Sequence, residues 1–549
     1  MSRPPFRASE PVDFLIVGSG AAGGVLANEL ATAGFSVVVL EQGPWLREKD
    51  FTHDEFDVGF RSALTNDPAR QPNTYRRSSS DAVQVRKVVE YGRLVGGGSV
   101  HFTANYWRFH ETDFRERSRW GDVPGATLAD WPISYAELEP YYTKAEYEIG
   151  VSGLDGSNPF EPPRSRPYPL PPMRVKSSGV LFERAARRLG LHPYPAPVAI
   201  LSRPYRGRGA CTLCGFCEKF GCEVRAKSST LATVIPAALK TGRCEIRPNS
   251  YARKIQVDRR GRAGGVVYFD ARRREVFQRA KAVVVCANGA ETPRLLLMSK
   301  SNLFPDGLAN SSGLVGKNFM VDSWVFVSGL FEHPLNEFKG IQVTRVVQDY
   351  YDSDPRRGCY GGAGIDCRFD WYPISFALSG LPPDAPAWGS GFKEAIAHYY
   401  TRTMALLAHC TCLPVESNSV SLDPAHKDAW GLPALRVTFD SHPDDVINMR
   451  FMKDRMVEML DVAGARKTWA LPIGDLLPSA HLMGTCRMGD DAKRSVINRD
   501  HRAHDVPNLF LVDGSSLVTS GRQQPTATIQ ALAYRAAERI TRLAKSGSL

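Results

Sequence analysis

Four cysteines lie within twelve residues of this chain, and their spacing suits metal chemistry. They occur in the run Cys211-Thr-Leu-Cys214-Gly-Phe-Cys217-Glu-Lys-Phe-Gly-Cys222. Thiolates that converge from one loop are typical ligands of an iron–sulfur cluster, and the glycines give the backbone room to wrap around it. Four cysteines also satisfy a closed tetrahedral zinc site. A reduced, thiol-rich loop without a metal is the third interpretation, and spacing alone leaves all three open.

A glycine-rich turn near the N-terminus predicts a phosphate-binding site. The strand-like run Asp13 to Val17 leads into Gly18-Ser-Gly20-Ala-Ala-Gly23, and a helical pattern follows. Gly18 permits the tight turn, Gly20 lets the backbone approach a pyrophosphate, and Gly23 lets the helix pack closely on the strand. The N-terminus of that helix would then face the phosphate charge.

A second apolar run, Val37 to Leu40, ends in Glu41, which follows Gly18 by 23 residues. A carboxylate at the end of this second strand can accept hydrogen bonds from ribose hydroxyls. The turn and the acid together predict a dinucleotide site, but they do not choose between NAD and FAD.

A family resemblance, carried by several distant segments, decides between NAD and FAD. The segments are Tyr91 to His101, Gly289 to Leu297, His481 to Gly489, Pro507 to Ser515 and Gln523 to Leu532. With the glycine turn, this set resembles the glucose–methanol–choline oxidoreductase family over nearly the whole chain. Within that family the chain is most similar to the large subunits of bacterial gluconate, ketogluconate and sorbitol dehydrogenases. The resemblance implies FAD as the cofactor and hydride transfer from an alcohol carbon to flavin N5.

The same resemblance assigns catalytic roles to His481 and Gln524. His481 lies where the family has its base, and a neutral imidazole with a pKa near 6.5 accepts a hydroxyl proton at physiological pH. The family normally has a His or Asn just before the proline of its C-terminal motif, and here Gln524 precedes Pro525. An amide can still orient a hydroxyl, but the extra methylene changes its reach.

Further residues are implied to contact the flavin. The backbone of Gly97, Gly98 and Ser99 is expected to contact the cofactor, and Asp513-Gly514 is expected near the phosphate and ribityl region. His101 aligns with a histidine that is covalently joined to the flavin in pyranose oxidases. A covalent flavin and a histidine that only packs near the ring are the two alternatives.

The resemblance also bears on Cys211, Cys214, Cys217 and Cys222. Some bacterial glucose dehydrogenases of the family carry a three-iron cluster in a cysteine-rich loop at this place, although their cysteine spacing differs. A three-iron or four-iron iron–sulfur cluster here implies a dehydrogenase that passes electrons to a haem or quinone partner, with a small companion subunit and a cytochrome c. An oxidase that uses oxygen, with a structural loop, is the alternative. A flavoprotein scaffold without turnover would require His481 to be idle.

The net charge of +11 has a more local interpretation than nucleic-acid binding. The basic residues lie among the enzyme segments and form no nucleic-acid motif. Arg206, Arg208 and Lys219 surround the cysteine run, and we expect them to attract an acidic redox partner.

The elements that position these residues must come from separated pieces of the chain. A length of 549 residues exceeds one ordinary core, so two domains are expected. We predict an α/β, Rossmann-like FAD-binding domain from 1–115, 225–315 and 470–549. Residues 116–224 form a connecting region with the cysteine run. Residues 316–469 alternate apolar and polar positions, which predicts an α+β substrate-binding domain with an antiparallel sheet.

The sequence gives no sign of a membrane span or an export signal. The start, Met-Ser-Arg-Pro-Pro-Phe-Arg, has no apolar core and no twin arginine. No apolar stretch approaches the ~20 residues that a membrane helix requires. The expectation is a cytoplasmic chain, with periplasmic co-export by a signal-bearing partner as the alternative.

Overall fold

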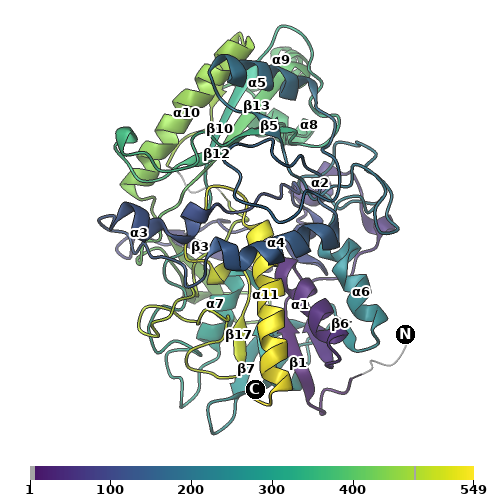
Figure 1. Cartoon of the computed structure of the whole chain (residues 1–549), viewed down its shortest axis with the longest axis vertical. Helices are drawn as coiled ribbons and strands as arrows, with labels where there is room; N and C mark the ends of the chain where they lie inside the picture. Colours follow the sequence, from purple (N-terminus) through teal and green to yellow (C-terminus); the bar gives the residue numbers. More distant parts are fainter. Residues whose placement is uncertain (1–5, 475–477) are drawn as a thin grey trace.

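The structure is a computed structural model, and it describes residues 6–474 and 478–549. Two parts lie one above the other along the long axis in Figure 1. The lower part holds the first helix and the last one side by side, and the upper part holds a second sheet with its own helices.

A seven-stranded sheet organises the lower part. Its order is β6-β2-β1-β9-β8-β7, and β17 pairs with β9. Strands β6, β2, β1, β9 and β17 pair in parallel, whereas β7 and β8 extend the sheet in antiparallel fashion. The bounds are β1 (Val12–Val17), β2 (Val37–Leu40), β6 (Cys244–Arg247), β7 (Tyr251–Val257), β8 (Ala263–Phe269), β9 (Glu275–Val285) and β17 (Leu509–Leu511).

The glycine turn joins β1 to a helix, as predicted. Strands β1 and β2 are short apolar runs that are almost wholly buried, which is usual for parallel strands covered on both faces. Helix α1 packs against α6 and α11, and α11 packs against α4. The bounds are α1 (Ala21–Thr32), α4 (Tyr135–Ile149), α6 (Val234–Lys240), α7 (Asn288–Met298) and α11 (Thr526–Lys545).

The second sheet confirms the predicted antiparallel sheet. Its order is β16-β10-β13-β12-β11-β5, and every pair in it is antiparallel. The bounds are β5 (Tyr194–Pro195), β10 (Ser323–Leu330), β11 (Arg345–Val347), β12 (Ala363–Arg368), β13 (Thr403–Cys410) and β16 (Lys467–Ala470). Helices α10 (Pro443–Ala463) and α5 (Ser177–Arg188) cover it, as Figure 1 shows at the upper end.

Strand alternation gives this sheet two chemically different faces. Along β13, Met404, Leu406, Ala408 and Cys410 enter an apolar core with the methionines of α10. Because side chains alternate across a strand, Leu407 and His409 must point to the other face. Polar side chains on the face away from the helices can therefore line a site.

A third, four-stranded sheet connects distant segments. Its order is β14-β15-β3-β4, with bounds β3 (Asn73–Arg76), β4 (Gln84–Val85), β14 (Ser419–Lys427) and β15 (Pro433–Thr438). The remaining helices are α2 (Glu55–Gly59), α3 (Glu116–Trp120), α8 (Pro373–Ser375) and α9 (Gly389–Arg402).

The predicted division into domains stays a prediction, although the sheets show which segments pair. Strand β3, from the first predicted flavin segment, pairs with β15, and β5, from the predicted connecting region, pairs with β11. Within the described residues, none of the helices has the length and apolarity that a membrane crossing requires.

Candidate active site

One cavity of about 720 Å³ extends from the glycine turn to His481. Its wall includes the N-terminal end of α1 and the segment after β9, and it continues to the second sheet. Sequence-predicted residues on this wall are Gly18, Gly20, Glu41, Gly97, Gly98, Ser99, His101, His481, Asp513, Gly514 and Gln524. The volume lies within the usual range for a ligand or cofactor site.

The glycine turn has the geometry that its sequence predicts. Gly18 has a φ of +95°, and a Cβ there would lie 2.4 Å from the carbonyl oxygen of Cys286. A Cβ on Gly23 would lie 1.9 Å from the carbonyl oxygen of Gly18. At Gly20 the nearest atom to an added Cβ is the Cα of Gly97, at 3.8 Å. Two glycines are thus required by backbone contact, and the third faces the cavity.

Glu41 lies at the cavity wall but already has protein partners. Its carboxylate accepts hydrogen bonds from the Ser19 hydroxyl at 2.8 Å and from the Gly43 amide at 2.9 Å. Burial raises the pKa of Glu41, although these hydrogen bonds oppose that effect. The acid therefore ties the glycine turn to the end of β2, and its contact with a ribose stays a prediction.

The other predicted cofactor contacts reach the cavity on short 3₁₀ turns. Gly97–Val100 forms one turn, and the Ser99 hydroxyl donates to the Gly96 carbonyl at 2.7 Å. Asp513 precedes the second turn and accepts from the Thr292 hydroxyl at 2.6 Å, so it also fixes the start of α7. A Cβ on Gly514 would lie 2.4 Å from the Leu482 carbonyl oxygen, which requires a glycine there.

His101 is buried on the cavity wall with one ring nitrogen unsatisfied. Its Nε2 has no hydrogen-bond partner, and burial lowers the pKa of His101 to about 4. The ring is therefore neutral at pH 7 and offers either a nucleophile or a hydrogen-bonding atom to a group in the cavity. Both alternatives for this histidine, covalent and packed, stay predictions.

His481 is held by a buried carboxylate that sequence reasoning missed. Its Nδ1 donates to Asp322 Oδ2 at 2.6 Å, and the side chain is 16% exposed on the cavity. Burial alone would raise the pKa of Asp322, but the charges and hydrogen bonds of His481 and His409 hold that pKa well below its usual range. Asp322 is consequently an anion beside the predicted base.

His409 is a second imidazole in the same place, and no sequence motif marks it. Its Nδ1 donates to Asp322 Oδ2 at 3.0 Å, and its Nε2 lies 3.1 Å from Asp366 Oδ2. The Gln524 side-chain nitrogen is 2.7 Å from the same Nε2. Burial alone would lower the pKa of His409, but hydrogen bonds with Asp322 and Asp366 raise it above its usual value.

A signal for His409 was nevertheless present in the sequence. It is a histidine in the mostly apolar strand β13, on the face opposite to the α10 core. On the neighbouring strand β12, Asp366 and Arg368 share that face, and the Arg368 guanidinium binds the Asp366 carboxylate at 2.5 Å. The structure therefore places His481 and Gln524 on the same cavity and connects them through His409 and Asp322, and their catalytic roles stay predictions.

The cysteine run adjoins the cavity. Glu218 and Lys219, which follow Cys217, line the cavity wall, and the Lys219 amide donates to the His101 carbonyl at 2.7 Å. Lys227 is buried behind the loop and donates to the Cys217 and Phe220 carbonyls at 2.6 and 2.7 Å. The Lys227 amine thus stabilises loop carbonyls, although burial lowers the pKa of Lys227.

The four thiols do not form one compact ligand set. Burial raises the pKa of Cys211 to about 11 and of Cys217 to about 12, so both are protonated thiols at neutral pH without a metal.

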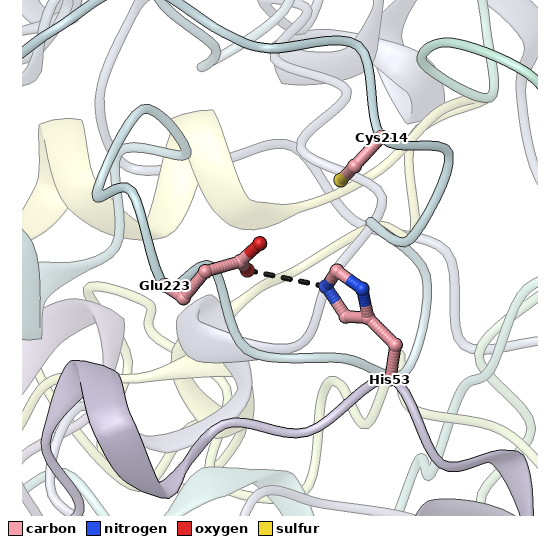
Figure 2. A group of neighbouring side chains, drawn as sticks. All are labelled: His53, Cys214 and Glu223. Carbon is pink, nitrogen blue, oxygen red and sulfur yellow. Dashed lines mark hydrogen bonds and ion pairs between the residues drawn. The ribbon is translucent and has the colours of Figure 1, made fainter.

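Among the described residues, the group of three metal-type donors that lie within 4.8 Å of one another comes from His53, Cys214 and Glu223. Figure 2 shows these three side chains. His53 stacks on Phe216 at 4.2 Å and lies 3.2 Å from Glu223. Metal binding by the cysteines stays a prediction, and His53 could not be found from spacing.

One expectation about the basic residues is wrong. Arg208 is buried, and its guanidinium donates to the Arg225 carbonyl at 3.2 Å and to the Ser228 hydroxyl at 3.1 Å. Its charge stabilises main-chain carbonyls and does not face a partner. Arg206 is at the surface but is paired with Glu148 at 2.5 Å, whereas Lys219 is exposed.

Comparison with known proteins agrees with this geometry. Two models described as GMC oxidoreductase match residues 12–323 and 414–533. The chain is 35% identical to the 2-methyl-1,2-propanediol dehydrogenase of Mycolicibacterium austroafricanum, over 97% of this chain and 96% of that one. It is 31% identical to the gluconate 2-dehydrogenase flavoprotein of Pantoea cypripedii, over 96% and 93%.

A solved structure has the same fold at low sequence identity. The chain matches a formate oxidase of Aspergillus oryzae with a TM-score of 0.65 and 15% identity, over 98% of this chain and 99% of that one. The family models together cover most of the chain, and the cavity joins the glycine turn to the imidazole of His481. The chain therefore belongs to the GMC (glucose–methanol–choline) oxidoreductase family, whose members are FAD-dependent enzymes that oxidise alcohol groups.

Proposed function

We propose that this chain is a dehydrogenase that oxidises an alcohol group of a sugar, polyol or sugar acid and passes the electrons through an iron–sulfur cluster to a protein acceptor. The observation that carries this proposal is that Glu218 and Lys219 of the cysteine run line the same cavity as His481. Electrons would thus have a short route from the cavity to the loop.

The side chains at the inner end of the cavity suit alcohol oxidation. FAD, when bound, supplies the acceptor for the hydride that leaves the alcohol carbon. His481 donates Nδ1–H to Asp322, so its Nε2 is free to accept the hydroxyl proton. The alcohol thereby loses a hydride and a proton and becomes a carbonyl compound. Asp322 stabilises the imidazolium that forms.

The substrate class rests on the relatives and on the polar wall. Two relatives are named for 2-methyl-1,2-propanediol and for gluconate, both of which carry neighbouring hydroxyls. Arg368, Asp370 and Glu218 line the cavity, and they offer donors and acceptors to further hydroxyls. Arg368 and Asp370 already bind each other at 2.8 Å, and a polyhydroxylated substrate would add hydrogen bonds to their remaining donors and acceptors.

The cysteine loop has features that fit an iron–sulfur cluster. The Leu213 amide donates to Cys211 Sγ at 3.4 Å, and such N–H to sulfur bonds stabilise a metal-bound thiolate. The buried Lys227 ammonium would offset the negative charge of thiolate ligands. A cluster bound there supplies a one-electron carrier, and Cys211, Cys214, Cys217 and Cys222 would hold it.

The acceptor and the compartment follow from the same proposal. A cluster near the surface serves a protein partner, so we propose a haem or quinone-linked acceptor and a small companion subunit. If that partner carries an export signal, the chain would reach the periplasm with it.

Anaerobic flavin reduction tests the function, and reoxidation tests the acceptor. Sugars, polyols, sugar acids and benzylic alcohols are mixed with the yellow, FAD-loaded protein, and bleaching is followed. We expect bleaching by a polyhydroxylated compound, then slow reoxidation by oxygen and fast reoxidation by an artificial one-electron acceptor. Rapid reoxidation by oxygen would favour an oxidase with a structural cysteine loop. No bleaching by any alcohol would contradict the whole proposal.

A further inference from the structure

Asp322 and His409 connect the side chains of His481 and Gln524, which both line the cavity. His481 Nδ1 donates to Asp322 Oδ2 at 2.6 Å, and His409 Nδ1 donates to the same oxygen at 3.0 Å. His409 Nε2 then lies 2.7 Å from the Gln524 amide. The predicted base and the predicted amide are therefore the two ends of one chain of hydrogen bonds, whose two middle members are buried.

We propose that Asp322 and His409 are positioning residues for alcohol oxidation: Asp322 fixes the tautomer of His481, and His409 turns the Gln524 amide so that its NH₂ group donates to the substrate oxygen. The inference rests on the proposed function, because it specifies how the same site holds the alcohol.

The carboxylate of Asp322 decides which nitrogen of His481 carries the proton. A carboxylate only accepts hydrogen bonds, so the nitrogen that faces it must be protonated and the other nitrogen is left as the proton acceptor. The indole nitrogen of Trp324 also donates to Asp322 Oδ2, at 3.0 Å, and its ring meets the His481 ring edge-on at 5.7 Å. The base is thus fixed in both rotation and tautomer.

His409 has a carboxylate on each side, which favours protons on both ring nitrogens. Asp322 faces Nδ1 and Asp366 faces Nε2. The Arg368 nitrogen that binds Asp366 at 2.5 Å also lies 3.2 Å from His409 Nε2, so the shorter contact directs its N–H to the carboxylate. Arg368 also binds Asp370 at 2.8 Å, so the carboxylates of this group outnumber its guanidinium and favour an imidazolium at His409. A buried charge is tolerated when it is paired in this way.

A protonated Nε2 on His409 determines the orientation of Gln524. Two N–H groups cannot bond to each other, so the Gln524 oxygen must face His409 across the 2.7 Å contact. The opposite orientation leaves Gln524 Oε1 buried without a partner. Oxygen and nitrogen of an amide have the same shape, so the exchange requires no other movement. The NH₂ group then faces the cavity, where it can stabilise charge that develops on the substrate oxygen.

Double-mutant cycles test both links through the rate of anaerobic flavin reduction at saturating alcohol. Asp322→Asn should lower this rate by ~10²–10³-fold and change substrate Kd by less than ~3-fold, because it disturbs the base and not binding. In the His481→Ala background the same change should cost less than ~3-fold. The control is Asp423→Asn, which alters a buried carboxylate bound to Thr74 and Arg436 outside the cavity.

The second cycle combines His409→Gln with Gln524→Ala. His409→Gln should slow reduction by ~10-fold in the native background and have no further effect when the amide is absent. Additive losses in both cycles, or a native rate in Asp322→Asn, would overturn the inference. A purely structural role predicts additive losses, together with loss of FAD and of thermal stability.

Nitrogen-15 NMR of labelled histidines gives a readout that needs no substrate. We expect a neutral His481 with its proton on Nδ1 and a doubly protonated His409, with signals assigned by their loss in His481→Ala and His409→Gln. A proton on Nε2 of His481, or a neutral His409, would sink the inference even if alcohols reduce the flavin. If NMR shows the expected protonation states but no alcohol is oxidised, the proposed function is refuted and the inference about the two histidines is not.

Discussion

The imidazole of His481 combines two properties that a base in alcohol oxidation needs. It lies on the cavity wall, and its Nδ1 lies 2.6 Å from the buried carboxylate of Asp322, which by our proposal keeps the proton on that nitrogen. An unanchored imidazole would divide its time between two tautomers and several rotamers. Removal of the ring should therefore affect the chemical step more than cofactor binding.

His481→Ala should retain FAD and lose most substrate-driven flavin reduction. Loss of a general base typically costs 10²–10⁴-fold in rate, roughly 3 to 5 kcal/mol of barrier. Stopped-flow absorbance under anaerobic conditions measures the rate, and His398→Ala on α9, outside the cavity lining, is the matched control. Near-native reduction in His481→Ala would mean that another group is the base.

At the scale of elements, two local structures bring the site together. The glycine turn brings the N-terminal end of α1 to the cavity because Gly23 lets the helix touch the carbonyl of Gly18. Strand β13 carries His409 into the same cavity because its alternate residues are anchored in the α10 core. Each element therefore exposes one chemical face and buries the other.

Gly23→Ala should reduce FAD binding strongly, because the new methyl group would lie 1.9 Å from the Gly18 carbonyl oxygen. The helix must move away from the strand, and the N-terminal amides lose their alignment with the phosphate. We expect at least ~10-fold weaker FAD binding, of the order of the ~1.4 kcal/mol that a factor of ten represents. Fluorescence titration of the apoprotein measures it. Gly209→Ala, where an added Cβ meets nothing within 4 Å, should bind FAD normally.

The cysteine loop permits a prediction that separates its function from that of the cavity. If it holds a cluster, the protein contains iron and sulfide in stoichiometric amounts, and Cys217→Ser leaves alcohol reduction of the flavin intact while transfer to the partner falls at least ~10-fold. Cys359→Ser, in a separate loop, is the control. Zinc without iron, or full partner-linked turnover in Cys217→Ser, would contradict the relay.

At the scale of the whole molecule, several buried histidines are neutral at pH 7, and they make the free energy of unfolding depend on pH. Burial lowers the pKa of His101 and His110 to about 4 and of His501 to about 3. In the unfolded chain these rings titrate near 6.5, so below that pH the unfolded state binds more protons than the folded state. Their contribution to stability is present above about pH 6.5 and falls as the pH drops toward 4.

The urea concentration at the midpoint of unfolding should therefore decrease as the pH is lowered from 7 to 5. A pKa lowered by two units corresponds to about 3 kcal/mol when the pH falls below both values. His501→Gln removes one such group at a site bonded to the Leu511 carbonyl and outside the cavity lining, so its unfolding midpoint should depend less on pH. An equally steep dependence in His501→Gln would show that other groups dominate.

Short-range sequence patterns were sufficient to predict many of the strands and helices of this protein. The run from Asp13 to Glu41 predicts strand, turn, helix and strand, because backbone sterics and apolar alternation act over a few residues. Alternation between 316 and 469 likewise predicts the antiparallel sheet. His481 and Gln524 could be placed on the cavity wall from the sequence because each lies in a contiguous motif, whereas their catalytic roles stay predictions.

Only the tertiary structure decided what surrounds these residues. Asp366 and His409 lie on β12 and β13, and Asp322 immediately precedes β10. They meet because the register of these three strands places them together. His53 reaches the cysteine loop from a segment about 160 residues away, where Phe51 packs against Gly221. Arg208 is buried for the same kind of reason. These side-chain contacts depend on strand register and on the packing of distant segments. A local pattern of residues carries no information about either.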